Sequence, residues 1–229
     1  KDFPWLKKYP KGVAHEIQLN EYPSLVELFE DSCTRYKDQV AYENMGVKLT
    51  YGEIYELSGH FAAYLQQGLG LKKGERIAIQ MPNLLQFPVA FMGSIRAGLI
   101  VVNTNPLYTA REMEYQFKDA SISAIVIVEN FGHNLEKVLA NTPIKNIILT
   151  TLGDMLGPLK GAVVNFVVRR VKKMVPPFRI PHTQSFKDAL KQGKTLELTK
   201  PAINSEDIAV LQYTGGTTGV SKGAQLSQS

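Results

Sequence analysis

One short segment combines the residue types that bind phosphate groups, and it directly follows the apolar run 208–211. It consists of Tyr213, Thr214, Gly215, Gly216, Thr217, Thr218, Gly219, Val220, Ser221, Lys222, Gly223 and Ala224. Glycines allow positive φ angles, so that successive backbone N–H groups can point at one anion, and threonine hydroxyls add donors or a metal ligand. The lysine supplies one mobile positive charge for a phosphate group. We therefore expect a phosphate-binding loop.

Two other interpretations compete with this loop. A Walker A loop ends in Gly-Lys followed by Ser or Thr at the start of a helix, whereas here Lys222 precedes Gly223 and no helical run follows. A surface hairpin is the commonest use of a Gly/Thr-rich composition. Such hairpins rarely combine several glycines, several hydroxyls and a single lysine, so we favour the phosphate loop.

The order Tyr-Thr-x-Gly-Thr-Thr-Gly-x-x-Lys-Gly over 213–223 closely resembles the nucleotide loop of the adenylate-forming enzymes, which are the acyl-CoA synthetases and their relatives. The two-glycine start and the surrounding sequence are most similar to bacterial-type long-chain fatty acyl-CoA synthetases. The stretches 81–83 and 103–108 also resemble this family, and the similarity extends from about Tyr51 to Leu226. The resemblance implies the N-terminal portion of the adenylate-forming enzyme fold.

The resemblance also implies a reaction and roles for the loop residues. Enzymes of this family join a carboxylate to ATP, release pyrophosphate, and pass the acyl group of the acyl-adenylate to the thiol of coenzyme A. The implied substrates and cofactors are a long-chain fatty acid, ATP, Mg²⁺ and coenzyme A. By motif position, residues 214–219 and Lys222 would wrap the β- and γ-phosphates, Tyr213 would anchor the strand end, and Thr214 would help to hold Mg²⁺.

Several parts of that site have no counterpart in these 229 residues. They are the family's adenine and ribose contacts, its hinge and the lysine of its C-terminal domain, and Gln228 stands where relatives usually have a histidine. We therefore expect the N-terminal part of a longer enzyme, which folds largely alone but is inactive alone, and whose uncovered strand edge favours a homodimer. The alternatives are a non-catalytic nucleotide- or phosphate-binding module and a peripheral membrane-binding domain.

The composition is that of a globular protein with a substantial core. Cys33 is the only cysteine and lies on an apolar helical face, so we expect a buried, unreactive thiol and a reducing, cytoplasmic location. No apolar run approaches the roughly twenty residues that span a bilayer. A net charge of +5 is modest, but its local concentration at 169–173 indicates an anionic partner. Without aromatic residues among these cations, nucleic acid is not expected.

From Glu75 onward apolar runs alternate with helical patterns, which predicts an α/β fold with a parallel sheet flanked by helices. We expect residues 1–72 to form helices and a hairpin that pack on the core, and residues 73–229 to form the α/β domain that ends in the phosphate loop. Strands are expected at 40–44, 47–51, 76–81, 99–102, 124–128, 146–150 and 208–211. Helices are expected to follow Ser24, Thr50, Asn83 and Thr109, with two more near 133–140 and 185–192; Ser24, Thr50 and Thr109 each begin a capping box.

The turn 103–108 follows a predicted strand, as the phosphate loop does. Ligands of open parallel sheets gather beyond the carboxyl ends of the strands, so the two segments are expected to share one cleft. The alternative is that Asn105-Pro106 is only a turn signal without a ligand role, and the sequence alone favours this alternative.

The segment 155–182 interrupts the alternation. Its part 161–175 joins an aliphatic run to Arg169, Arg170, Lys172 and Lys173, and we expect a helix there that Pro176-Pro177 closes. One interpretation is a basic amphipathic helix on an anionic membrane surface, which would place the protein on the inner face of the membrane. The other, which we favour slightly, is a helix packed on the domain with a solvated basic edge.

Overall fold

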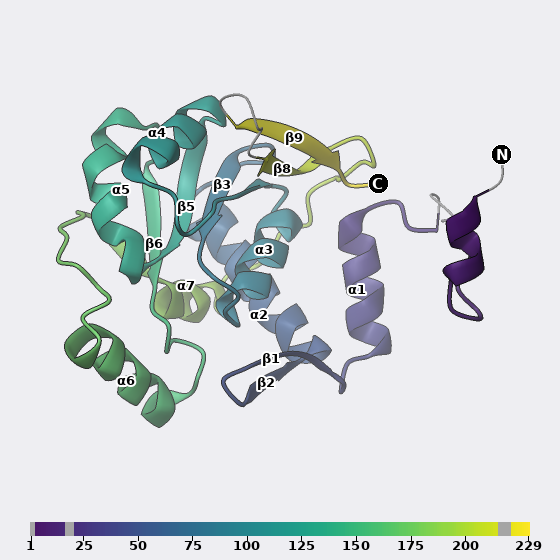
Figure 1. The fold of residues 1–229 in the computed structure, drawn as a ribbon, viewed down its shortest axis with the longest axis horizontal. Coiled ribbons are helices and arrows are strands. Elements are labelled where there is room, and N and C mark those ends of the chain that lie inside the picture. The colour runs from purple at the N-terminus through teal and green to yellow at the C-terminus, as the bar shows by residue number, and fades with distance from the viewer. Residues whose placement is uncertain (1–2, 17–20, 215–220) are drawn as a thin grey trace.

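The computed structural model describes residues 3–16, 21–214 and 221–229. Within them, a seven-stranded sheet has the order β7-β6-β5-β3-β4-β8-β9 (Figure 1). Neighbouring strands are parallel, except that β9 runs antiparallel to β8. The strands are β3 (Arg76–Gln80), β4 (Ile100–Asn103), β5 (Ile122–Val128), β6 (Asn146–Thr150), β7 (Thr183–Ser185), β8 (Ile208–Thr214) and β9 (Lys222–Ser227). The predicted α/β fold with a mostly parallel sheet is confirmed.

Helices cover both faces of this sheet (Figure 1). One face carries α2, α3 and α7, and the other carries α4 and α5. The helices are α1 (Leu25–Arg35), α2 (Tyr51–Ala63), α3 (Gln86–Arg96), α4 (Ala110–Asp119), α5 (Gly132–Val138), α6 (Pro158–Phe166) and α7 (Phe186–Gly193). None of the helices in the described part of the chain is long and apolar enough to cross a bilayer.

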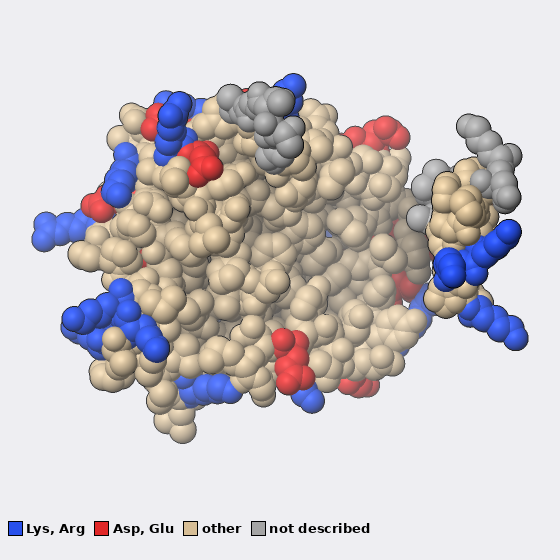
Figure 2. Space-filling model, viewed as in Figure 1, with Lys and Arg blue, Asp and Glu red and all other residues tan. Residues whose placement is uncertain are grey.

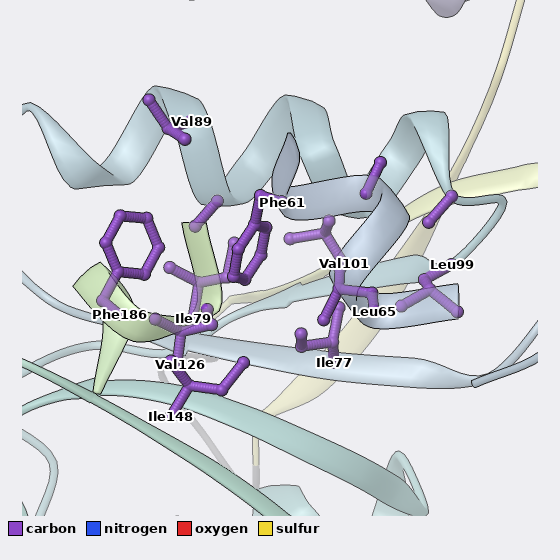
Figure 3. Packing of buried hydrophobic residues seen from close by; sticks show 14 of the residues in the cluster. Phe61, Leu65, Ile77, Ile79, Val89, Leu99, Val101, Val126, Ile148 and Phe186 are labelled. Atoms are coloured by element: carbon purple, nitrogen blue, oxygen red, sulfur yellow. The ribbon is translucent and has the colours of Figure 1, made fainter. Parts of the chain in front are cut away.

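The central strands are buried on both faces because their side chains alternate between two clusters. Ile77 and Ile79 of β3 face the larger cluster, where Phe61 packs against Phe186 with 5.1 Å between ring centroids (Figure 3). Ala78 faces the opposite cluster, which α4 and α5 complete. This arrangement explains why the runs predicted as strands lack polar alternation.

The predicted N-capping residues stand at the starts of α1, α2 and α4, but one of them forms only half of the predicted capping box. Thr50 and Thr109 form complete capping boxes with the glutamates three residues later. The Ser24 side chain accepts a hydrogen bond from the Glu27 N–H at 3.2 Å, but the described contacts contain no reciprocal bond from the Ser24 N–H to the Glu27 side chain. Ser24 is therefore an N-cap rather than a full capping box, and the N–H of the next residue, Leu25, bonds to the carbonyl of Gln228.

Turn residues with positive φ separate the elements. β1 (Val40–Asn44) and β2 (Val47–Thr50) form the predicted hairpin, whose turn residues Met45 and Gly46 have φ of 49° and 74°. Gly98 has φ of 82°, a left-handed conformation that glycine adopts without strain, and it lets the chain leave α3 and enter β4.

The sequence does not predict two strands of the sheet, β7 and β9. β7 has only three residues, all polar, at the edge of the sheet, so it carries no hydrophobic signal. β9 is the opposite edge strand and most of its residues are exposed. It forms through main-chain pairing with β8, which a hydrophobic pattern does not report.

Cys33 is 3% exposed, as predicted for an unreactive thiol. Burial raises the pKa of the thiol from 9.0 to about 11. In the unfolded chain the thiol loses its proton near pH 9, whereas the folded chain retains it up to about pH 11. The contribution of Cys33 to stability is therefore complete below about pH 9 and is lost as the pH rises toward 11.

We expect Cys33→Ala to flatten the fall in unfolding free energy between about pH 9 and pH 11. Urea unfolding at several pH values in this range would measure the slope, and buried tyrosines would account for the part that remains. Identical slopes for the variant and the parent chain would contradict the prediction.

Candidate phosphate-binding site

The predicted phosphate loop connects two paired strands. β8 and β9 pair Tyr213 with Gly223 and Thr214 with Lys222, so the ends of both strands meet where the loop begins. The intervening loop residues Gly215, Gly216, Thr217, Thr218, Gly219 and Val220 lie outside the described residues. The structure thus describes the base of the predicted site, and this base is a β-hairpin at the carboxyl end of β8.

Tyr213 fixes the end of β8 to the helix layer. Its side chain is buried in the cluster under α4, and its hydroxyl donates a hydrogen bond to the Asp119 carboxylate. Burial and this hydrogen bond raise the pKa of Tyr213, so the hydroxyl stays protonated at neutral pH. A Cβ atom at Gly223 would lie 3.0 Å from Cε2 of Tyr213, which gives the glycine on the paired strand a packing reason.

Thr214 and Lys222 are the two exposed residues at the base of the loop. They are cross-strand partners, so their backbones lie next to each other where the two strands end. Among the described residues, Lys222 takes part in no ion pair. A hydroxyl and an ammonium group are therefore available beside the predicted loop, while Ser221 is half-buried and Ala224 is exposed on β9.

Hydrogen bonds of amide side chains connect the strand ends next to this hairpin. Asn103 Nδ2 donates to Gln212 Oε1 at 3.1 Å, which joins β4 to β8. Gln116 Nε2 on α4 donates to the Asn103 carbonyl at 3.1 Å. Gln80 Nε2 at the end of β3 donates to the Asn105 carbonyl at 3.3 Å. The motifs do not predict these glutamine contacts, although a polar residue that closes an apolar strand is a signal that could have identified Gln80 and Gln212.

The turn 103–108 begins beside β8, because β4 and β8 are neighbours in the sheet and Asn103 pairs with Gln212. The Asn105 side chain accepts a hydrogen bond from the Leu107 N–H at 2.9 Å, the geometry of a local Asx turn. This contact accounts for Asn105-Pro106 as a turn. A cleft shared with the loop stays a prediction.

No group of three or more His, Cys, Asp or Glu side chains that could hold a metal occurs within the described ranges. Thr214, the residue that the family resemblance implies as a Mg²⁺ ligand, offers one exposed hydroxyl oxygen. Oxygen is the ligand atom that Mg²⁺ prefers, so Thr214 fits as a single ligand.

A parallel sheet with a glycine- and threonine-rich loop at a carboxyl strand end defines the class of α/β proteins that bind ligands at this edge. The model of the AMP-binding enzyme family matches residues 29–229. The chain belongs to this family.

Curated proteins with similar sequences support this family assignment. The chain is 56% identical over 223 residues to a long-chain-fatty-acid–CoA ligase of Salmonella typhimurium, covering 97% of this chain and 40% of that protein. It is 38% identical to the ligase of the same name from Bacillus subtilis, covering 98% of this chain and 40% of that protein. The chain thus spans about 40% of the length of the curated relatives that it matches.

Solved structures show the same fold at low sequence identity. The crystal structure of an anthranilate CoA ligase in complex with anthranoyl-AMP has a TM-score of 0.73 at 20% identity, covering 93% of this chain and 36% of that one. A benzoate CoA ligase from Burkholderia xenovorans has a TM-score of 0.68 at 20% identity, covering 90% of this chain and 34% of that one. The fold is that of the adenylate-forming enzymes.

Proposed function

We propose that this chain supplies the phosphate-binding part of an ATP-dependent long-chain fatty acid–CoA ligase. The supporting observation is the hairpin that presents Thr214 and Lys222 at the ends of the glycine- and threonine-rich loop. The 56% identity to a long-chain-fatty-acid–CoA ligase supports the choice of reaction. The partners of the whole protein would be a fatty acid, ATP and coenzyme A, with Mg²⁺ as a cofactor, and its location the cytoplasm.

The proposed reaction solves a chemical problem of the substrate. A free carboxylate is a poor acyl donor because its leaving group would be oxide. Joining the carboxylate to the α-phosphate of ATP releases pyrophosphate and converts the leaving group into AMP, which the thiol of coenzyme A then displaces. The protein must therefore hold the carboxylate in line with the α-phosphate and disperse the charge on the triphosphate.

The residues at the base of the loop fit the second of these tasks. The Lys222 ammonium would bind the β- and γ-phosphates together with the N–H groups of the loop. The Thr214 hydroxyl would contribute one ligand to Mg²⁺, which when bound neutralises part of the phosphate charge. Tyr213 and Gln212 would keep the strand end in place through their bonds to Asp119 and Asn103.

The proposed substrate class can be tested by comparing carboxylic acids. We expect the full-length protein to turn over palmitate faster than octanoate, acetate or benzoate when acyl-CoA formation is measured with ATP and coenzyme A. The 229-residue chain alone should form no acyl-CoA in this assay, because it spans about 40% of the length of the ligases it resembles. A preference for acetate or benzoate would contradict the long-chain assignment, and turnover by the chain alone would contradict the proposed incomplete site.

A further inference from the structure

The helical segment formed by α6 and the following π-helical turn Val167–Val171 directs polar side chains toward the protein. Asn165 Oδ1 accepts a hydrogen bond from the Gly153 N–H at 2.8 Å, and Asn165 Nδ2 donates to the Thr151 hydroxyl at 2.9 Å. Arg169 donates three hydrogen bonds of 2.7 to 3.0 Å to the Glu129 carboxylate. Glu129 is only 7% exposed and the Arg169 side chain is 48% exposed, so partly buried polar contacts hold this segment on the domain.

A close backbone contact fixes the orientation of α6. A Cβ atom at Gly161 would lie 2.3 Å from the Gly153 carbonyl oxygen, and a Cβ atom at Gly153 would lie 2.3 Å from the Gly161 carbonyl oxygen. The helix therefore packs directly on the turn that follows β6. Rotation of the helix about its axis would break this contact and the bonds of Asn165 and Arg169 together.

The outward face of α6 is apolar. Leu159, Val163 and Phe166 recur at the i, i+4 and i+7 spacing of one helix face, and they are 84%, 63% and 61% exposed. A helix on the surface of a water-soluble domain normally carries polar residues on its outward face. Val164 and Val168 already supply the inward apolar contacts of this segment, so the exposed apolar face is not needed for packing on the domain. It therefore marks an interaction surface.

Cations follow this apolar face at the end of the helical segment. Arg170, Lys172 and Lys173 are exposed, and none of them takes part in an ion pair within the described part of the chain. Figure 2 shows Lys and Arg side chains gathered at the lower left, where Figure 1 places α6. Attraction to the carboxyl end of the helix would account for the cations. It does not account for the exposed Leu159, Val163 and Phe166.

We propose that this outward face docks on the surface of an anionic lipid bilayer. The docking face consists of Leu159, Val163, Phe166, Arg170, Lys172 and Lys173. Apolar side chains of an interfacial helix enter the boundary between headgroups and acyl chains, while adjacent cations bind lipid phosphates. A second copy of the chain fits this face poorly, because a two-fold interface would bring the same cations together. The proposal extends beyond the ligase function and does not depend on it.

Co-sedimentation with vesicles tests the electrostatic part of this proposal. The vesicles contain either equal parts of phosphatidylcholine and phosphatidylglycerol or phosphatidylcholine alone. The purified protein should bind the anionic vesicles and be released by salt. Each cation near an anionic surface contributes about fivefold to binding. Changing Arg170, Lys172 and Lys173 to Gln together should therefore lower the partition coefficient by on the order of 100-fold.

A matched control removes the same charge elsewhere. Changing Lys137, Lys145 and Lys191 to Gln alters three exposed lysines outside the docking face, and these also form no ion pair among the described residues. This control should keep most of the binding, because charges distant from the bilayer are screened. Arg169 is left unchanged in both variants because its bonds to Glu129 hold the segment in place.

A second variant tests the apolar part. Changing Val163 and Phe166 to Ser should leave the circular dichroism spectrum unchanged, because both side chains are largely exposed, and should weaken vesicle binding at least about tenfold. Equal sedimentation of the cation variant and its control would overturn the proposal, as would failure of the parent protein to bind anionic vesicles. A dimer that the Ser variant dissociates, without vesicle binding, would assign the face to a second copy instead.

Discussion

Replacing Lys222 with Ala should slow ATP–pyrophosphate exchange by about 100-fold to 1,000-fold at saturating fatty acid in the full-length protein. Lys222 is exposed and begins β9 opposite Thr214, where the loop starts. The substitution would remove a positive charge from the proposed triphosphate site without disturbing the buried core. The loss should therefore appear in the adenylation step rather than in protein stability.

The control for this experiment is Lys145→Ala. Lys145 is exposed and directly precedes β6, so it lies at the amino end of the sheet, away from the loop. This control should exchange pyrophosphate at the parent rate. If Lys222→Ala also exchanged at the parent rate, the loop would have no role in the proposed mechanism.

Phe61→Ala should reduce the unfolding free energy by about 3–5 kcal/mol. Phe61 is fully buried between the sheet and α3, and its ring packs against Phe186. The truncation would leave a cavity that rigid neighbours fill only in part. Urea unfolding followed by circular dichroism would measure the change.

Phe166→Ala is the matched control for this substitution. The same atoms are removed, but Phe166 is 61% exposed, so the change should stay within about 0.5 kcal/mol. Similar losses for the two variants would mean that the core does not lie between α2, α3 and the sheet.

The sequence predicts the inner strands well because their physical signal is strong. β6 has the predicted bounds of 146–150, and β5 begins only two residues before the predicted 124. Both are short aliphatic runs rich in β-branched residues, which is the pattern of strands that lose water on two faces. The edge strands β7 and β9 carry polar or small residues, and only their pairing partners identify them.

The sequence predicts less of the candidate site than of the fold. The sequence indicates where the phosphate loop begins and ends, because glycine, threonine and lysine each have a local reason to be there. The amide contacts of Gln80, Asn103, Gln116 and Gln212 depend on strand order, which periodicity does not contain. The exposed apolar face of α6 likewise becomes visible only when the contacts of Asn165 and Arg169 that orient the helix are known.

The pairing of β4 with β8 also constrains how the chain folds. Asn103 and Gln212 are 109 residues apart, and between them lie the segments that form β5, β6 and β7. Closing so long a loop adds little to the free-energy cost of the native state but slows the search for the contact. During synthesis β4 therefore pairs only with β3 on one side until β8 has emerged, so the strand end that carries Tyr213 and Thr214 joins the sheet late.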